Sequence, residues 1–306
     1  MKKCLAIVIT GPTSSGKSAL AVELARIFDT EVISADSRQI YKGIPIATAV
    51  PTVEERGGVK HHLLECLNLE DYYSASLFEQ QSVKLLGEIF KQRDTAIVCG
   101  GSMLYVDALV NGIDELPTVP AHVRQSLELE WNEKGDEWLL SSLECLDPEY
   151  YKKIDHRNLK RVFHAVEVSI TAGNPYSSLL SKPKIERDFK ILKICLTGNR
   201  NLLFDRINTR VEDMIKKGLE EEARNVYHLR NLNSLNTVGL KEMFAWFDGR
   251  MNKDEAIARI QKNTRVYAKK QETWHKKDKK AVRLDFASPL IENINKIVTL
   301  TNRRFS

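Results

Sequence analysis

The chain has 306 residues, of which 42% are hydrophobic and 28% are charged, as in a globular protein of one large or two smaller domains. No apolar run approaches the roughly 20 residues that span a bilayer, and the charged start MKKC leads straight into an apolar segment, so we expect neither a membrane span nor a signal peptide. The net charge is +5, but residues 259–283 hold ten Lys or Arg and two Asp or Glu, which indicates a polyanionic partner.

The five cysteines are scattered, without a C-x-x-C pair. This spacing argues against a zinc site and against a disulfide framework. We expect buried, reduced thiols in a cytoplasmic protein. The cysteines are Cys4, Cys66, Cys99, Cys145 and Cys195.

The stretch Gly11–Ser18 (GPTSSGKS) fits the phosphate-binding pattern G-x-x-x-x-G-K-[ST]. It follows an apolar run typical of a strand, Leu5–Thr10, and precedes an Ala-rich helical segment, Ala19–Phe28. Its glycines allow tight turns, so that backbone N–H groups converge on phosphate oxygens at a helix N-terminus. Lys17 would add a cation, and the Ser18 hydroxyl would hold Mg²⁺ that bridges two phosphates. The loop predicts a bound di- or triphosphate without saying which.

A second strand is expected at Glu31–Ala35, and Asp36 follows it. Loops beyond the carboxyl ends of parallel strands form the ligand crevice of α/β sheets, so we expect Asp36 to face the same crevice as Lys17. A carboxylate beside a phosphate-binding loop is electrostatically unfavourable unless it holds a metal ion or removes a proton. The alternative is that Asp36 caps the turn that follows it.

Two further loops are expected to reach the crevice, at Ile46–Thr52 and at His61–Leu64. The two adjacent histidines have no third ligand at helical spacing, which favours a structural or substrate-positioning role over a metal site. A helix at Ser76–Phe90 is expected to pack on the sheet. Its apolar residues include Leu77, Val83, Leu86 and Phe90.

A further buried strand is expected at Thr95–Cys99, and it leads into Gly100, Gly101 and Ser102. In a motor NTPase or a GTPase, this strand would end in an Asp that supports the magnesium site. The lack of that Asp argues against these classes. It favours a reaction in which the phosphates are the leaving group over a reaction in which water attacks a phosphate bond.

The composition changes after Asp114, where a linker with two prolines leads into a charged helical pattern over residues 121–170. Within this pattern, Lys152–Arg161 holds five Lys or Arg, which form either a solvated helix face or a nucleic-acid contact. The polar stretch 173–184 is expected to be an exit loop.

The next buried strand is expected at Phe189–Leu196, which returns the chain to the sheet. We therefore predict an α/β fold with a P-loop NTPase-like parallel sheet flanked by helices. Residues 1–114 and 188–306 would form this core. Residues 115–187 would form a helical insertion domain.

Two arginines are four residues apart on an expected helix at Asn201–Lys217, so they share one face. Arg206 and Arg210 could grip a diphosphate bidentately. The alternative is surface ion pairing with Asp205 or Asp213.

The last long helix is expected at Lys253–Lys276, with Asn252 and Glu255 as its N-terminal cap pair. The stripe expected to pack against the protein comprises Ile257, Ile260, Thr264, Tyr267, Gln271 and Trp274. A basic ridge nearly opposite comprises Lys262, Arg265, Lys269 and Lys276. A one-sided ridge of this kind suits binding to a phosphate backbone.

Five segments resemble the successive signatures of the tRNA dimethylallyltransferases, also called tRNA isopentenyltransferases. They are GPTSSGKS at 11–18, ISADSRQIYKG at 33–43, HHLLE at 61–65, GGSMLYVDAL at 100–109 and TRVYAKKQETW at 264–274. The segments extend in order through almost the whole chain, and the last four are more specific than the first. The insertion also resembles the helical domain with which that family embraces the anticodon stem-loop.

The resemblance implies transfer of a dimethylallyl group from dimethylallyl diphosphate to N6 of the adenosine just 3′ of the anticodon, in tRNAs that read codons beginning with U. Diphosphate leaves, Mg²⁺ is the cofactor, and the catalytic residues would be Asp36 as general base, Ser102 and Lys17. Ser18 would hold Mg²⁺ through the diphosphate. The diphosphate would be bound by Gly11, Pro12, Thr13, Ser14, Ser15, Gly16, Lys17 and Ser18, with Arg206 and Arg210. The tRNA contacts would be Asp36, Ser37, Arg38, Gln39, Ser102, Arg124, Arg157, Asn158, Leu159, Lys160, Arg161, Lys262, Arg265 and Lys269.

The sequence departs from the family pattern at a few positions. The family usually has GGTGLY, and this chain has Ser102 and Met103 in place of Thr and Gly. A tyrosine of the family's VGY stretch is Leu240 here, so stacking by that residue is lost. The lack of a zinc finger fits a bacterial-type enzyme, and we expect a cytoplasmic monomer without a membrane partner.

Three other functions stay open. A small-molecule kinase can share the phosphate loop and the Asp after the second strand, but it leaves the basic ridge and the insertion unexplained. A relative that prenylates free adenine nucleotides would need no insertion that grips a stem-loop. A non-catalytic RNA-binding module would have little use for Lys17, Ser18 and Asp36.

Overall fold

The computed structural model describes residues 4–114, 116–180 and 185–305. These residues form two compact units. The sheet unit comprises Met1–Val110 and Arg187–Ser306, and the helical unit comprises Asn111–Glu186. The first residue of the predicted linker, Glu115, and the end of the predicted exit loop, residues 181–184, lie outside the described residues.

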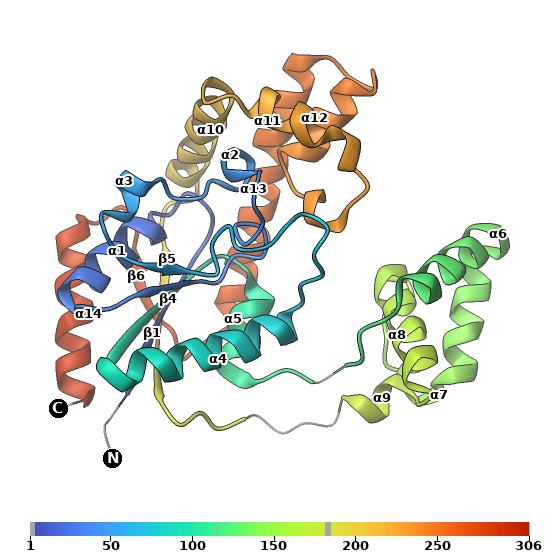
Figure 1. The fold of residues 1–306 in the computed structure, drawn as a ribbon, viewed down its shortest axis with the longest axis horizontal. Coiled ribbons are helices and arrows are strands. Elements are labelled where there is room, and N and C mark those ends of the chain that lie inside the picture. Colours follow the sequence, from blue (N-terminus) through green and yellow to red (C-terminus); the bar gives the residue numbers. More distant parts are fainter. Residues whose placement is uncertain (1–3, 115, 181–184, 306) are drawn as a thin grey trace. The chain divides into compact units, whose positions relative to one another are not determined.

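The sheet unit is built on a six-stranded parallel sheet with the strand order β3-β2-β4-β1-β5-β6 (Figure 1). Its strands are β1 (Leu5–Thr10), β2 (Val32–Ser34), β3 (His61–His62), β4 (Thr95–Cys99), β5 (Lys190–Thr197) and β6 (Val282–Asp285). Strands β1 and β4 are buried along their whole length, as expected of central parallel strands that helices cover on both faces. The predicted P-loop NTPase-like sheet flanked by helices is confirmed.

The prediction of a crevice loop at His61–Leu64 is wrong for the two histidines, which form the edge strand β3 beside β2. Each imidazole has a local partner. Nδ1 of His61 lies 2.9 Å from the carbonyl oxygen of Val59, and Nε2 of His62 lies 2.5 Å from Oε2 of Glu31. The backbone of β2 would otherwise have an unpaired edge, and this pairing is a tertiary effect that the polar sequence does not reveal.

The predicted loop at Ile46–Thr52 also contains secondary structure. It holds most of a short helix, α2 (Pro45–Thr48), and the cap of α3 (Val53–Arg56). A proline begins α2, where its missing N–H costs no hydrogen bond. Thr52 and Glu55 form a capping box at the start of α3.

The helices that pack on the two faces of the sheet form the hydrophobic core together with its strands. They are α1 (Lys17–Ile27), α4 (Ala75–Gln92), α5 (Met103–Asn111), α10 (Arg200–Lys216), α13 (Lys253–Lys277) and α14 (Leu290–Phe305). On α4, the fully buried residues are Ala75, Phe78, Ser82, Leu86 and Ile89. The predicted packing of Leu86 is confirmed, whereas Leu77, Val83 and Phe90 are partly exposed at the edges of this stripe.

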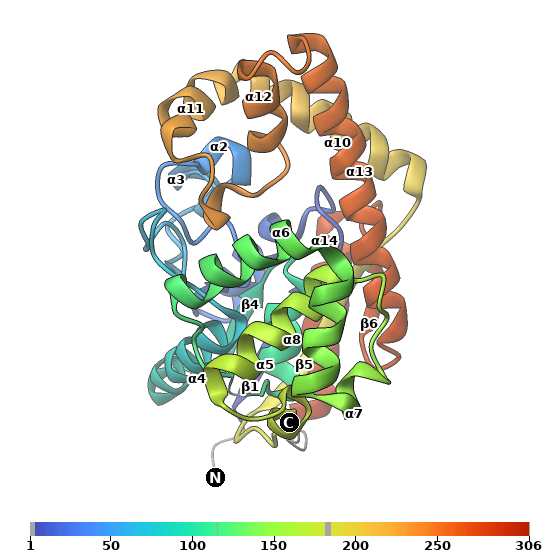
Figure 2. The same ribbon diagram turned by 90° about the vertical axis from the view of Figure 1, so that its right-hand side faces the viewer.

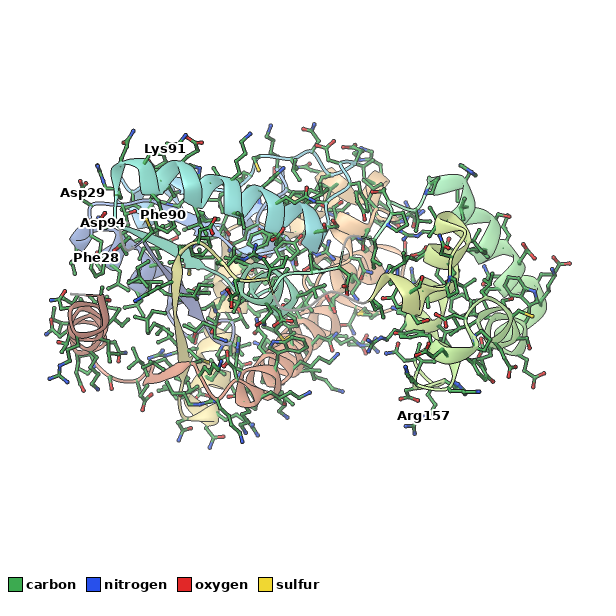
Figure 3. All side chains as sticks on the ribbon, turned by 90° about the horizontal axis from the view of Figure 1, so that it is seen from below. Phe28, Asp29, Phe90, Lys91, Asp94 and Arg157 are labelled. Carbon is green, nitrogen blue, oxygen red and sulfur yellow. The ribbon has the colours of Figure 1, made fainter. Side chains whose placement is uncertain are left out.

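The ends of α1 and α4 meet at the amino-terminal edge of the sheet. Figure 3 labels Phe28 and Asp29 after α1, and Phe90, Lys91 and Asp94 at the end of α4, all at this end of the unit. Strands β2 and β4 begin here. The loops that follow the carboxyl ends of the parallel strands, including the phosphate-binding pattern after β1, therefore lie at the opposite edge.

A second core packs beyond the sheet. It joins α2 to α11 (Leu219–Val226), α12 (Leu240–Phe247), the C-terminal part of α10 and the N-terminal part of α13. Two 3₁₀ turns, η1 (Tyr227–Leu229) and η2 (Asn233–Leu235), connect α11 to α12. Figures 1 and 2 show α13 running beside α10 and α12. This second core covers the carboxyl edge of the sheet.

Helix α13 begins with the predicted Asn252–Glu255 capping box. Its packing stripe differs from the prediction, because Tyr267 and Trp274 are 39% and 40% exposed. The fully buried residues are Ala256, Ile260, Ala268, Gln271 and His275. Ala268 belongs to the same buried cluster as Leu203 and Ile207 of α10.

The predicted basic ridge on α13 is partly engaged with α10. Arg265 donates a hydrogen bond to Oδ1 of Asn208 at 2.5 Å, and Nζ of Lys269 lies 5.4 Å from the ring centroid of Phe204. Lys262 and Lys276 are exposed. The ridge therefore combines two solvated lysines with two side chains that also hold the helix pair together.

The helical unit has its own core. Its helices are α6 (Ala121–Leu146), α7 (Pro148–Tyr151), α8 (Leu159–Ala172) and α9 (Tyr176–Leu179). Leu139, Leu143, Val162 and Val166 are completely buried between α6 and α8. Gly135 has φ +80° and kinks α6, which Figure 2 shows as two differently directed halves.

The cysteines are free thiols, as predicted, but their predicted burial is wrong for two of them. Cys99 and Cys195 are buried in β4 and β5, and Cys4 is partly buried beside β1. Cys66 and Cys145 are exposed, because neither lies on a strand of the central sheet.

Candidate active site

The loop Gly11–Ser18 adopts a tight conformation between β1 and α1. Gly11 has φ +143°, and a Cβ there would lie 2.8 Å from the carbonyl oxygen of Leu196 on β5. Ser14 and Gly16 also have positive φ values, of 62° and 83°. Such a run of left-handed residues turns successive backbone N–H groups toward one side, and glycine supplies it at low cost.

Two hydroxyl groups of this loop have no hydrogen-bond partner among the residues that the structure describes. The Oγ atoms of Ser14 and Ser15 are buried and make no hydrogen bond. Buried polar atoms are normally paired, so these hydroxyls mark a place where a polar ligand can bind. The loop ends at the N-terminus of the eleven-residue helix α1, where the helix dipole favours an anion.

Lys17 at the end of this loop has a backbone partner and a shifted pKa. Its Nζ donates a hydrogen bond to the carbonyl oxygen of Pro12 at 2.6 Å. Burial lowers the pKa of Lys17 to about 8, with a further lowering by Arg210, whereas Cys99 and Asp36 oppose the shift. A bound diphosphate would supply the negative charge that stabilises the ammonium form.

The two arginines of α10 have different partners. Arg210 donates from Nη1 to Oγ1 of Thr13 at 3.2 Å, so it lies directly against the phosphate loop. Arg206 instead donates to the carbonyl oxygen of Phe286 at 3.4 Å, and its guanidinium lies 5.1 Å from that ring's centroid. The spacing of four residues places Arg206 and Arg210 on one side of α10. Their partners differ because a different segment of the chain lies next to each of the two helical turns.

Asp36 fulfils the turn-capping alternative and also reaches the crevice. Its Oδ1 accepts hydrogen bonds from the backbone N–H groups of Arg38 at 2.9 Å and Gln39 at 3.3 Å. Within the described parts of the chain, Oδ2 makes no hydrogen bond. One oxygen thus orients the carboxylate, and the other stays available to a substrate.

The side chains after Asp36 hold neighbouring loops. Gln39 donates from Nε2 to the carbonyl oxygens of Thr48 and Ala49 at 3.1 and 2.8 Å. Arg38 donates to the carbonyl oxygen of Asn233 at 2.8 Å. The predicted tRNA-contacting run therefore also fixes the walls of the crevice.

A cavity of about 300 Å³ opens between these groups. Its polar lining comprises Thr13, Asp36 and Arg210, together with Ser37, Arg38, Thr48, Asn236, Thr237, Lys241, Thr264 and Tyr267. Its apolar lining comprises Ala47, Val211, Met214, Val238 and Ile260. Arg210 and Met214 also line a larger cavity of about 670 Å³, which Ser18 borders. A lining that offers both charged and apolar side chains suits a short hydrocarbon with a charged head group.

The loop after β4 packs closely against the loop that carries Asp36. A Cβ at Gly100 would lie 2.1 Å from the carbonyl oxygen of Ala35, which also accepts the backbone N–H of Ser102 at 3.2 Å. Ser102 is 9% exposed. The glycine is thus required by the close approach of two backbones, and Ser102 follows at the same edge of the sheet as Asp36.

Sequence reasoning missed two polar residues of the site. Gln271 on α13, which was assigned to packing, accepts the backbone N–H of Thr13 at 2.9 Å and donates to the carbonyl oxygen of Gly101 at 2.8 Å. Glu222 on α11 accepts the N–H groups of Ile46 and Ala47 at 2.7 Å each. An amide within an otherwise apolar stripe was a signal for Gln271, whereas nothing local distinguishes Glu222 from its glutamate neighbours.

Comparison with known proteins identifies the family of this site. The sequence model described as IPP transferase matches residues 39–278, well over half of the chain. The chain belongs to the IPP transferase family. The match begins after Asp36 and does not include the phosphate loop. The assignment of that loop therefore rests on its geometry.

Curated relatives of the family are similar over most of their length. A protein named tRNA dimethylallyltransferase 2 from Parabacteroides distasonis is 47% identical over 89% of this chain and 91% of its own. A tRNA dimethylallyltransferase from Christiangramia forsetii is 45% identical over 89% and 90%.

Solved structures agree. The full-length tRNA isopentenylpyrophosphate transferase from Bacillus halodurans has a TM-score of 0.73 and 31% identity, covering 100% of this chain and 97% of its own. A eukaryotic dimethylallyltransferase described as acting on tRNA has a TM-score of 0.83 and 26% identity, covering 99% and 79%.

The helical unit of this IPP transferase family member carries the second predicted basic cluster. Asn158 caps α8 by accepting the backbone N–H of Arg161, and Leu159 is partly buried at the first turn. The side chain of Arg157 is 92% exposed and projects outward in Figure 3. Lys160 is exposed too, whereas Arg161 donates to the hydroxyl of Tyr150 at 3.0 Å.

Arg124 has a structural partner in the helical unit. It makes two hydrogen bonds of 2.7 Å to the carboxylate of Glu167, which is 2% exposed. His164 also lies 2.9 Å from this carboxylate. Much of the guanidinium's bonding capacity is therefore used inside the unit.

No helix in the described ranges is long and apolar enough to cross a membrane. The same ranges contain no group of three or more His, Cys, Asp or Glu side chains that could hold a metal ion. The paired histidines of β3 are therefore not part of such a group.

Proposed function

We propose that this protein transfers a dimethylallyl group from dimethylallyl diphosphate to N6 of the adenosine just 3′ of the anticodon, in tRNAs that read codons beginning with U. The observation that carries the proposal is the 300 Å³ cavity. It brings the carboxylate of Asp36 to the same space as Thr13 of the phosphate loop and Arg210, beside an apolar lining.

The reaction balances with these groups. The N6 nitrogen forms a bond to C1 of the dimethylallyl group, and the bond from C1 to the diphosphate oxygen breaks. Asp36 accepts the proton that N6 loses, a contribution of roughly 10² to 10⁴ in rate. Lys17, Arg210 and the loop N–H groups stabilise the negative charge that develops on the leaving diphosphate.

The apolar wall supports an allylic substrate rather than water as the reaction partner. Val211, Met214 and Ile260 exclude solvent from the region where the hydrocarbon would lie. An allylic carbon activated by a departing diphosphate would otherwise be hydrolysed.

The residues at the loop fit Mg²⁺ bound through the substrate. Mg²⁺ is usually held by few protein ligands together with phosphate oxygens, and the unpartnered Ser14 and Ser15 hydroxyls indicate a polar ligand at this loop. We assign Ser18, whose side chain is exposed at the start of α1, as the protein ligand. The ion would neutralise charge on the diphosphate.

The tRNA would contact both units. In the sheet unit we assign Ser37, Arg38, Gln39 and Ser102 to the anticodon loop, and Lys262, Arg265 and Lys269 to the phosphate backbone. In the helical unit we assign Arg124 and Arg157–Arg161 to the stem-loop. The target base is unpaired in its loop, so extruding it into the cavity costs only a few kcal/mol. We expect a cytoplasmic monomer.

The decisive test uses purified protein, Mg²⁺, radiolabelled dimethylallyl diphosphate and unmodified tRNA that reads codons beginning with U. Label should enter the tRNA and stay out of AMP offered as an alternative acceptor. Label in AMP alone would make the protein a nucleotide prenyltransferase. Consumption of ATP without any labelled product would instead establish the small-molecule kinase.

A further inference from the structure

Gln271 connects the two loops that would carry the leaving group and the acceptor. Its Oε1 accepts the Thr13 N–H at 2.9 Å, and its Nε2 donates to the Gly101 carbonyl oxygen at 2.8 Å. The side chain is 2% exposed, so no water competes for either bond. A buried amide with both ends satisfied is held in one position.

The contact chain continues from Gly101 to Asp36. A Cβ at Gly101 would lie 2.6 Å from Nε2 of Gln271, so the amide packs directly on this backbone. On the other side, Gly100 packs on Ala35, which precedes Asp36. Gln271 thus connects the phosphate loop to the Gly100–Gly101 backbone, which packs on the residue before Asp36.

The Thr13 N–H is occupied by this contact. Thr13 also accepts a hydrogen bond at its hydroxyl from Arg210. Two elements from distant parts of the sequence, α13 and α10, therefore fix one residue of the phosphate loop. This arrangement leaves the amides after Thr13 for a diphosphate.

We propose that Gln271 is a positioning residue that sets the distance between the diphosphate and the proton-accepting carboxylate of Asp36, an inference that rests on the proposed function. Its side chain is not among those that line the 300 Å³ cavity, so its effect would be indirect. A misplacement of about 1 Å between reacting groups can cost about 10² in rate, so a side chain that fixes this distance acts mainly on kcat.

The test compares Gln271→Met with the wild-type protein in steady-state transfer of labelled dimethylallyl groups to tRNA. Methionine has a similar length but makes neither hydrogen bond. We expect kcat to fall roughly 10- to 100-fold, with less than about a threefold change in KM for dimethylallyl diphosphate. Gln261→Met, the same change ten residues earlier on α13, is the matched control and should retain the wild-type kcat.

A second variant keeps the result interpretable if Gln271→Met does not fold. In Gln271→Glu, the carboxylate still accepts the Thr13 N–H but cannot donate to Gly101 until it is protonated. Its kcat relative to wild type should therefore rise as the pH is lowered from about 8 to about 5.5, because a buried carboxyl group has a raised pKa.

Two outcomes would overturn the inference. One is a folded Gln271→Met with unchanged kcat, and the other is a loss explained entirely by a lower melting temperature with normal turnover per folded molecule. Failure of the proposed function is distinct, since the wild-type protein itself would then transfer no label.

Discussion

Charged side chains are held in opposite ways at the crevice of the sheet unit and at the Arg157 segment of the helical unit. At the carboxyl edge of the sheet, Arg210 and Asp36 are partly buried and are fixed by bonds to neighbouring loops. In the helical unit, the Arg157 side chain is 92% exposed, and its ion-pair partner, Asp155, is two residues away. Fixed polar groups in a low-dielectric site can direct a reaction, whereas solvated cations mainly attract a polyanion.

The largest effect is expected from Asp36, where the chemistry of the sheet unit is concentrated. Asp36→Ala should bind tRNA nearly normally and lose roughly 10²- to 10⁴-fold in turnover. Single-turnover transfer with saturating tRNA, alongside a filter-binding measurement, checks both values.

The structure supplies a matched control for this experiment. Asp36→Asn keeps an oxygen that can accept the N–H groups of Arg38 and Gln39, but it cannot act as a base. Equal losses in both variants support the proton-accepting role. Normal turnover in Asp36→Asn would reduce Asp36 to a turn cap.

The two arginines of α10 offer a comparison within one helix. Arg210→Met should lower kcat/KM for dimethylallyl diphosphate by roughly 10²-fold, the usual cost of removing one donor to a developing anion. Arg206→Met should change kcat/KM by less than about threefold, because Arg206 contacts Phe286 rather than the phosphate loop. Similar losses for both would contradict the assignment of Arg210 alone.

The pH dependence of diphosphate binding should follow Lys17. Its pKa in the free protein is lowered to about 8, so the ammonium form that attracts an anion dominates below this pH and is lost above it. The dissociation constant of inorganic diphosphate should therefore increase above pH 8, by up to roughly tenfold per pH unit. Calorimetric titration at several pH values measures this increase.

Lys17→Met separates the lysine from the ionisation of diphosphate itself. The variant should bind more weakly at all pH values and show a flatter profile. An identical pH profile in the variant and the wild type would mean that Lys17 does not titrate in this range.

The smallest effect is expected in the helical unit. Arg157→Ala and Lys160→Ala should each weaken tRNA binding a few-fold and reduce the slope of log K against log salt concentration by about 0.7 to 0.9. Lys134→Ala, in which the lost lysine pairs with Glu130 on α6, is the control in the same unit. Unchanged slopes for Arg157 and Lys160 would exclude this segment from the tRNA footprint.

The elements with strong local signals were predictable from the sequence. The apolar runs at β1 and β4 and the Asn252–Glu255 cap of α13 are local properties of the chain. The phosphate loop was recognisable because its glycines and its Lys17-Ser18 pair are adjacent in sequence.

Features set by tertiary contacts were not predictable in the same way. The edge strand β3 carries two polar residues and exists because β2 offers it a partner. The difference between Arg206 and Arg210 depends on which loop approaches each turn of α10. The role of Gln271 depends on two loops that are far away in sequence.

The sheet also ends in a way that limits self-association. An exposed strand edge can pair with a second molecule and begin aggregation. Here one edge strand, β3, has two residues, and both carry imidazoles. The other edge strand, β6, has four residues, among which Arg283 and Asp285 are exposed and charged. Such short, polar edges offer a neighbouring chain little backbone to extend, so the buried strands β1 and β4 stay protected in the middle of the sheet.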